Sequence, residues 1–328
     1  MPLTRPSHPH RAPEILPPFT LGDWSAQQFE QIEQALSRWV ACPDDALSPD
    51  SSSAGMVSLS QAMRYAVLDG GKRLRPLLVL AACEAVNGNP QAALRAACAV
   101  ELIHAYSLVH DDMPCMDNDV LRRGKPTVHV KFGEAQALLA GDSLQALAFE
   151  FLTPGDDAPD AFDVAIQARL CRMLAQAAGY QGMAGGQAID LASVGLSLTA
   201  GQLHEMHRLK TGALLQASVM MGASCGAASL PVQAALRDYG AAVGLAFQVV
   251  DDILDVTADS ATLGKTAGKD AAHDKPTFVS LMGLEASRSY AQQLLARALA
   301  SLDTLQTCGL NHTDALRARA DMLVNRQH

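Results

Sequence analysis

The chain has 328 residues, of which 49% are hydrophobic and only 5% are aromatic, so it can bury the core of one large domain or two ordinary ones. Its formal net charge is −9. That charge excludes nonspecific nucleic-acid binding, which needs a broad basic surface, and an anionic ligand would have to be held by a local basic cluster.

The composition predicts helices. Alanine- and leucine-rich stretches recur along the chain, whereas runs of β-branched residues are scarce. No low-complexity linker or change of composition divides residues 21–328. We therefore predict an all-α fold, with one domain of ten or more helices over residues 21–328.

The hydrophobic pattern and the positions of glycine and proline place these helices along the chain. In chain order they are expected at residues 19–40, about 59–68, 74–86, 91–112, 133–152, 160–192, from Thr199 towards Lys210, from Pro231 to the aspartates near 251, and as a final pair over 278–326. Residues 122–126 form a basic loop in this scheme, and residues 256–277 form another loop.

The first 18 residues contain six prolines and two arginines but no apolar segment, so residues 1–20 are predicted to be a flexible tail and not a secretion signal. Seven scattered cysteines lack the spacing of a disulfide scaffold or a zinc site, which favours a reducing cytoplasm. Residues 211–236 carry no formal charge over 26 positions. Polar and small residues interrupt this segment, so we interpret it as buried helices and do not expect an integral membrane protein.

Two clusters of aspartates lie 140 residues apart in this apolar chain. The first contains Asp111, Asp112 and Asp117, and the second contains Asp251, Asp252 and Asp255. Carboxylates concentrated at two points of a helical scaffold would repel one another without a positive partner. Magnesium ions that carry phosphate oxygens are the candidate partner.

The two clusters differ in spacing. Asp251 and Asp255 are one helical turn apart and share a face, with Gln248 nearly on that face. An undistorted helix would place Asp111 and Asp117 about 120° apart, so Pro114 is expected to distort the first cluster. A solvated acidic helix end is the alternative interpretation of the second cluster, but its apolar neighbours disfavour it.

Residues that could bind phosphate surround the clusters. His104 lies two turns before Asp111 on the same side of the helix, although a lone histidine there could equally be a core residue. Each basic residue alone would be an ordinary surface charge, but together they offer arginine forks and lysine point charges for a diphosphate. These basic residues are Lys72, Arg73, Arg75, Arg122, Arg123, Lys210, Lys265, Lys269 and Lys275.

Six segments carry a resemblance to a known family: Gly70–Pro76, Glu101–Asp112, Arg122–Gly124, Gly141-Asp142, Lys210–Gly212 and Phe247–Asp252. They resemble the trans-prenyltransferase (polyprenyl synthetase) family, and within it the bacterial farnesyl diphosphate synthases. The resemblance covers about residues 25–325. It implies an isoprenoid synthase-like bundle around a central cavity, usually assembled as a homodimer.

The resemblance also implies roles for single residues. More than one Mg²⁺ ion, bridging an allylic diphosphate, would be held by Asp111, Asp112, Asp117, Asp251, Asp252 and Asp255. The same diphosphate would be contacted by Arg122, Lys210, Thr211, Gln248 and Lys265. Isopentenyl diphosphate would be bound by Lys72, Arg75, His104 and Arg123.

The implied reaction is the head-to-tail condensation of isopentenyl diphosphate with dimethylallyl and geranyl diphosphates, giving (2E,6E)-farnesyl diphosphate. Tyr106 lies five residues before Asp111, about 7.5 Å back along the helix, where relatives that stop at fifteen carbons carry a bulky aromatic. Helical phase alone would favour Ser107, so this role for Tyr106 depends on the resemblance. A geranylgeranyl or geranyl diphosphate synthase is the alternative.

Other classes of protein explain these residues less well. Residues 259–266 nearly match a phosphate-binding loop, but the first glycine is replaced by Asp259 and no strand precedes it. A metal phosphohydrolase using His110 and Asp111 would leave the second cluster unexplained. A terpene cyclase needs no isopentenyl site, and a regulatory subunit of a heteromeric prenyl synthase would tend to lose the aspartates.

Overall fold

The computed structural model describes residues 20–40, 54–68, 70–156, 158–257 and 277–326. The elements are α1 (Leu21–Trp39), α2 (Ala54–Leu68), α3 (Leu74–Ala85), α4 (Pro90–Asp111), β1 (Leu121–Arg122), β2 (Lys125–Pro126), α5 (Val128–Phe132), α6 (Glu134–Leu152), α7 (Val164–Ala178), α8 (Met183–Ala192), α9 (Ala200–His207), the one-turn π-helix η2 (Arg208–Gly212), α10 (Ala213–Ser224), α11 (Leu230–Thr257), α14 (Phe278–Met282), α15 (Leu284–Thr307) and α16 (Asp314–Val324). The predicted all-α fold is confirmed. Residues 1–19 lie outside the described residues, so the predicted tail stays a prediction.

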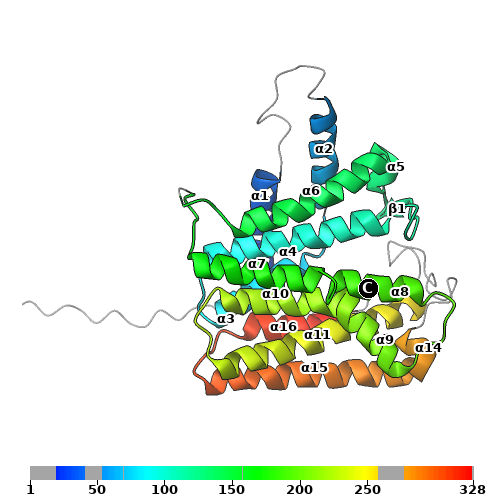
Figure 1. The fold of residues 1–328 in the computed structure, drawn as a ribbon. Helices are drawn as coiled ribbons and strands as arrows, with labels where there is room; N and C mark the ends of the chain where they lie inside the picture. Colours follow the sequence, from blue (N-terminus) through cyan, green and yellow to red (C-terminus); the bar gives the residue numbers. More distant parts are fainter. Residues whose placement is uncertain (1–19, 41–53, 69, 157, 258–276, 327–328) are drawn as a thin grey trace, which may run out of the picture.

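The long helices stack in layers (Figure 1). Helix α4 packs against α6 on one side and against α3 and α10 on the other, and α10 leads through α11 to α15 at the far edge. One continuous hydrophobic core runs through these contacts. This stacking places the end of α4 and the end of α11, the carriers of the two aspartate clusters, on one side of the bundle.

Helix α4 shows how the sequence specifies one of these elements. The side chain of Asn89 caps it by accepting hydrogen bonds from the backbone N–H groups of Gln91 and Ala92, and Pro90 occupies the first turn, where its missing N–H costs nothing. Buried alanines along α4 let its neighbours approach closely. The helix ends at Asp111, three residues before Pro114, as the sequence predicts.

The structure divides the segment predicted at residues 160–192 and adds a short helix that was not predicted. Residues 160–192, expected as one helical stretch, form α7 and α8 separated by a turn. Gly182 lies in that turn, and a Cβ atom there would lie 2.2 Å from the carbonyl oxygen of Ala177, so the turn requires glycine. The short α5 also precedes α6, with Gly133 between them at φ 88°, in the left-handed region that favours glycine.

The uncharged segment forms buried helix, as predicted: most of α10 is inaccessible to solvent. Among the described residues, α4 is the one helix long and apolar enough to cross a membrane, and 67% of its most apolar window is buried inside the structure. Burial of that extent is typical of the core helix of a helical bundle.

Candidate functional site

The first cluster is built at the C-terminal end of α4. After Asp112 the chain turns back on itself, and the backbone N–H of Asp117 donates a 2.9 Å hydrogen bond to the carbonyl oxygen of Asp111. Burial raises the pKa of Asp111 to about 6, with Lys210 opposing the rise and Asp117 adding to it. The turn after Pro114 therefore brings Asp117 back beside Asp111, which a straight helix could not do.

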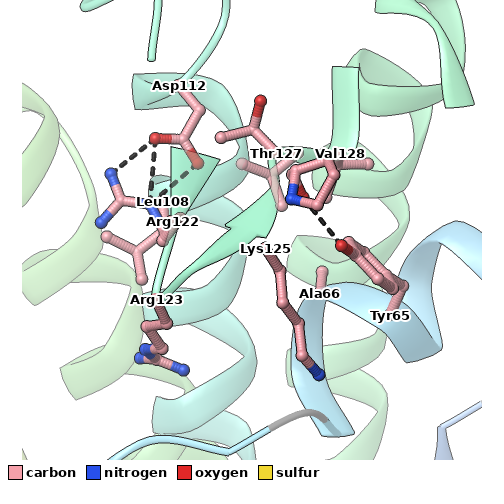
Figure 2. A pocket seen from close by; sticks show the side chains of 11 residues that line it. Tyr65, Ala66, Leu108, Asp112, Arg122, Arg123, Lys125, Thr127 and Val128 are labelled. Carbon is pink, nitrogen blue, oxygen red and sulfur yellow. Dashed lines mark hydrogen bonds and ion pairs between the residues drawn. The ribbon is translucent and has the colours of Figure 1, made fainter. Parts of the chain in front are cut away.

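Asp112 points to the other side of the turn. It is buried, and it accepts hydrogen bonds from Arg122 at 2.5 to 2.9 Å, from both Nε and Nη2 (Figure 2). Burial raises the pKa of Asp112 in spite of this arginine. Asp112, predicted to bind metal, and Arg122, predicted to bind phosphate, thus form an ion pair with each other.

The hairpin β1–β2 holds Arg122 and Arg123 in place. The Tyr65 hydroxyl on α2 donates a 2.8 Å hydrogen bond to the carbonyl oxygen of Pro126, at the rim of the pocket shown in Figure 2. Arg123 donates through Nη1 to the carbonyl oxygen of Gly70 at 2.6 Å. Because a Cβ at Gly71 would lie 3.0 Å from that guanidinium, the two glycines let Arg123 approach the backbone before α3.

The second cluster occupies the last turns of α11. The carboxylate of Asp251 is 38% exposed and accepts a 2.9 Å hydrogen bond from Arg326. Asp255, one turn later, is buried, and its Oδ1 has no hydrogen-bond partner. The other carboxylate, Asp252, is turned into the protein.

Asp252 belongs to a hydrogen-bonded chain between helices. Its Oδ2 accepts from the backbone N–H of Phe278 at the start of α14, and its Oδ1 accepts from Gln248, both at 2.8 Å. Gln248 in turn accepts a 3.2 Å hydrogen bond from the hydroxyl of Thr211. The chain therefore links η2, α11 and α14 behind the second cluster.

Lys210 lies in η2 and interacts with carboxylates on two other helices. Its Nζ is 2.5 Å from Oδ2 of Asp190 on α8, and its charge also acts on Asp111. Asp190 was not among the residues predicted from the sequence. A signal was present, because it is a lone carboxylate in the apolar helix that begins at Met183 and contains Gly185, Gly186 and Gln187.

The basic residues near the start of α3 do not all have the same role. Arg73, expected with its neighbours to be available for phosphate, is buried and pairs with Glu33 at 2.6 Å and Glu101 at 2.7 Å. That expectation was wrong for Arg73. Its left-handed backbone, at φ 45°, turns the side chain into the core beneath α3.

The remaining basic residues lie close to one another. Burial lowers the pKa of Arg75 to about 10. Burial first, and then the charges of Arg75, Arg123 and Arg122, keep the pKa of His104 well below its usual value. Burial and nearby Arg326 also lower the pKa of Lys72. Basic groups whose charged forms are disfavoured in this way favour an anionic ligand.

Tyr106 makes a contact of a different kind. Tyr106 is half-buried on α4 and meets the ring of His110 edge to face, with 5.7 Å between ring centroids. Lys265 lies outside the described residues, as do Lys269 and Lys275, so their predicted roles stay predictions.

Comparison with known proteins identifies the family. The description of the family model that matches residues 56–308 is Polyprenyl synthetase. The chain belongs to the polyprenyl synthetase family. The resemblance stated from the six sequence segments is thereby confirmed.

Several polyprenyl synthetase relatives match over most of this chain. "Probable farnesyl diphosphate synthase" of Sinorhizobium fredii is 51% identical over 279 residues, covering 84% of this chain and 80% of the relative. "Farnesyl diphosphate synthase" of Escherichia coli is 46% identical over 308 residues, covering 92% and 98%. "Geranylgeranyl pyrophosphate synthase 4" of Arabidopsis thaliana is 45% identical over 275 residues, covering 83% and 72%.

Solved structures agree with the fold. An FPP/GFPP synthase from Zymomonas mobilis superposes with a TM-score of 0.78 at 41% identity, covering 93% of this chain and 98% of that one. A geranyltransferase from Helicobacter pylori, complexed with magnesium and isoprenyl diphosphate, gives a TM-score of 0.77 at 34% identity, covering 97% and 98%. This polyprenyl synthetase therefore has the fold of prenyl-transferring enzymes.

The different surroundings of Arg73 and Lys72 predict different effects on stability. Replacement Arg73→Met should lower the free energy of unfolding by about 3 to 5 kcal/mol, because it leaves Glu101 buried without this partner. Lys72→Met, at an exposed neighbouring position, should change it by less than about 0.5 kcal/mol. Urea unfolding followed by circular dichroism measures both, and equal effects would contradict a structural role for Arg73.

Proposed function

We propose that this polyprenyl synthetase is a farnesyl diphosphate synthase. It would condense isopentenyl diphosphate with dimethylallyl diphosphate and then with geranyl diphosphate, giving (2E,6E)-farnesyl diphosphate. The single observation that carries this proposal is the pair of intact aspartate clusters at the ends of α4 and α11, beside a group of basic residues. Relatives named farnesyl diphosphate synthase, 46% and 51% identical, support the choice of product.

Magnesium fits the donors that the clusters offer. Asp111 is partly desolvated and interacts electrostatically with Asp117, and Asp255 has a buried oxygen without a hydrogen-bond partner. Within the described residues, no three acidic, histidine or cysteine side chains form a ready cation site. Each ion would therefore complete its shell with diphosphate and water oxygens, as Mg²⁺ commonly does.

The proposed metal ligands are the six aspartates, Asp111, Asp112, Asp117, Asp251, Asp252 and Asp255. Their present contacts differ, since Asp112 pairs with Arg122 and Asp252 with the start of α14. Asp111 and Asp251 represent the two clusters in the test of activity below. For the allylic diphosphate, the proposed protein contacts are Arg122, Lys210, Thr211, Gln248 and Lys265.

Isopentenyl diphosphate would occupy the second basic group. Arg75 and Arg123 both act electrostatically on His104, and Lys72 lies near Asp251 at the edge of the second cluster. His104 is neutral at pH 7, so it would donate or accept a hydrogen bond without adding charge. The guanidinium groups of Arg75 and Arg123 supply the planar forks that suit a diphosphate.

The mechanism follows from the charge distribution. Bound Mg²⁺ would supply positive charge that stabilises the departing diphosphate. Lys210 and Arg122 add cationic hydrogen-bond donors to the same oxygens, and the surrounding apolar helices exclude water from the allylic cation. The isopentenyl double bond attacks C1 of that cation, and loss of a proton to the released diphosphate regenerates an allylic double bond. No protein nucleophile is required.

The apolar outer face of α5 and α6 supports a homodimer. Val130, Leu138 and Leu139 are each about half exposed, at 50%, 48% and 48%. Large apolar side chains exposed on neighbouring helices, as on α5 and α6, are typical of a protein interface. We propose that a second copy of the chain covers this face, around α6 (Figure 1).

We also propose a cytoplasmic location, on the basis of the cysteines. All six cysteines among the described residues are free thiols, and three of them, Cys83, Cys98 and Cys225, are buried. A reducing compartment keeps such thiols reduced.

The activity can be tested with two five-carbon substrates. Purified protein with Mg²⁺, dimethylallyl diphosphate and isopentenyl diphosphate should yield a fifteen-carbon product by chromatography. Replacement Asp111→Ala or Asp251→Ala should lower turnover more than tenfold, because either change removes a proposed metal ligand. Asp303→Ala, at an exposed surface ion pair, is the matched control and should retain parental turnover. Release of monophosphate without elongation would contradict the proposal, and so would the absence of turnover expected of a regulatory subunit.

The length of the product tests the role of Tyr106. Replacement Tyr106→Ala removes a half-buried ring from α4 and should shift the product from fifteen towards twenty carbons. Product chromatography measures the shift, with Tyr180→Ala, at an exposed tyrosine, as the matched control. An unchanged fifteen-carbon product would exclude Tyr106 as the residue that limits growth, and a twenty-carbon product from the parent would favour the geranylgeranyl alternative.

The dimer can be tested by charging its proposed face. Leu139→Asp should convert a dimer to a monomer, because a carboxylate would be desolvated at the centre of an apolar interface. Light scattering coupled to gel filtration measures the mass, and Val164→Asp, at an exposed residue of α7, is the control. A monomeric parent, or a dimer that survives Leu139→Asp, would contradict this interface.

A further inference from the structure

The backbone that carries Lys210 is held by two glycine contacts. A Cβ atom at Gly186 of α8 would lie 2.1 Å from the backbone nitrogen of Lys210, and one at Gly244 of α11 would lie 3.0 Å from Cα of Gly212. Two helices thus touch η2 directly at the backbone. The single π-helical turn is fixed between them, and single π-turns within helices are frequent at functional sites.

Asp190 holds the side-chain ammonium group of the same lysine. Its carboxylate is buried on α8, with 7% of its side chain exposed, and Oδ2 lies 2.5 Å from Nζ of Lys210. The Lys210 side chain is 26% exposed, and its charge opposes the rise in the pKa of Asp111. The ammonium group therefore acts on two carboxylates, one buried behind it and one in the first aspartate cluster.

The nearby histidine does not replace Lys210 as the cation beside Asp190. His207 is buried, its ring lies 5.4 Å from that of Phe278, and burial lowers its pKa to about 4. It is neutral at pH 7. The surface cation Arg208 is paired with Glu205 on its own face of the helix, at 2.6 Å.

A lysine side chain has a flexible four-carbon stem, and ordering it costs conformational entropy when a ligand binds. A buried carboxylate that already holds Nζ reduces this cost before the ligand arrives. We propose that Asp190 is a positioning residue that fixes the Lys210 ammonium for the diphosphate of the allylic substrate. This inference rests on the proposed function, in which Lys210 contacts that diphosphate.

Steady-state kinetics with geranyl diphosphate, isopentenyl diphosphate and Mg²⁺ test the proposal. Asp190→Asn keeps the size of the side chain but removes its charge. It should lower kcat/KM for geranyl diphosphate at least tenfold while leaving KM for isopentenyl diphosphate within twofold of the parent. Asp190→Glu, which restores the carboxylate, should recover more than half of the loss on a logarithmic scale.

A double-mutant cycle shows whether Asp190 acts through Lys210. The double variant Asp190→Asn, Lys210→Met should be no more than twofold worse than Lys210→Met alone, because the positioned group is already absent. Effects that multiply in the double variant would overturn the proposal. So would Asp190→Asn kinetics within threefold of the parent, or an equal rise in KM for both substrates, which a general loss of structure would cause.

Asp160→Asn is the matched control. Asp160 also pairs with a basic residue, at 2.7 Å from Arg95, but the pair joins the start of α4 to the segment before α7. This variant should retain parental kinetics. Circular dichroism shows whether Asp190→Asn folds. If it does not, Asp190→Glu and the double-mutant cycle built on it decide the question. Kinetics of Asp190→Glu worse than those of Lys210→Met would then count against the proposal.

Failure of this inference can be separated from failure of the proposed function. If Lys210→Met itself has parental kinetics, the assignment of Lys210 to the allylic diphosphate is wrong, and the inference about Asp190 is wrong with it. If Lys210→Met is impaired while Asp190→Asn is not, the proposed function stands and only the positioning role is overturned.

Discussion

Carboxylates at the ends of apolar helices need partners of opposite charge, and this need shapes the whole site. Asp112 is held by Arg122 from the hairpin, Asp251 by Arg326 after the last helix, and Asp190 by Lys210 from η2. Each pair connects different segments of the fold, which are 10, 75 and 20 residues apart in the sequence. The charges that would bind substrate and metal therefore also join the helices that present them, so ligand binding and local structure are linked.

Close contact between backbones makes this arrangement possible. Glycines allow it at three helix crossings: Gly186 against η2, Gly244 against Gly212, and Gly222 of α10 against Val79 of α3, where a Cβ would lie 2.1 Å from the carbonyl oxygen. Any larger side chain would push the helices apart. Helices at these distances bring the ends of α4, α8, η2 and α11 near enough for single side chains to span the gaps between them.

Local rules accounted for most of the helices but not for the direction of each basic side chain. The capping residue Thr199 and the helix stop before Pro114 were predictable, because both depend on neighbours within one turn. Arg73 could not be told from Lys72 by spacing alone. Its burial against Glu33 and Glu101 depends on α1 and α4, 40 and 28 residues away in the sequence.

The sequence by itself determined the helical class, the two aspartate clusters and the resemblance to polyprenyl synthetases, because these depend on composition, helical period and short motifs. Only the tertiary structure decided which charges pair with which. It turned Asp252 towards α14, joined Asp112 to Arg122, and revealed Asp190 behind Lys210. The physical reason is that an ion pair depends on the distance between two side chains in space, and helix packing sets that distance through contacts that no single segment contains.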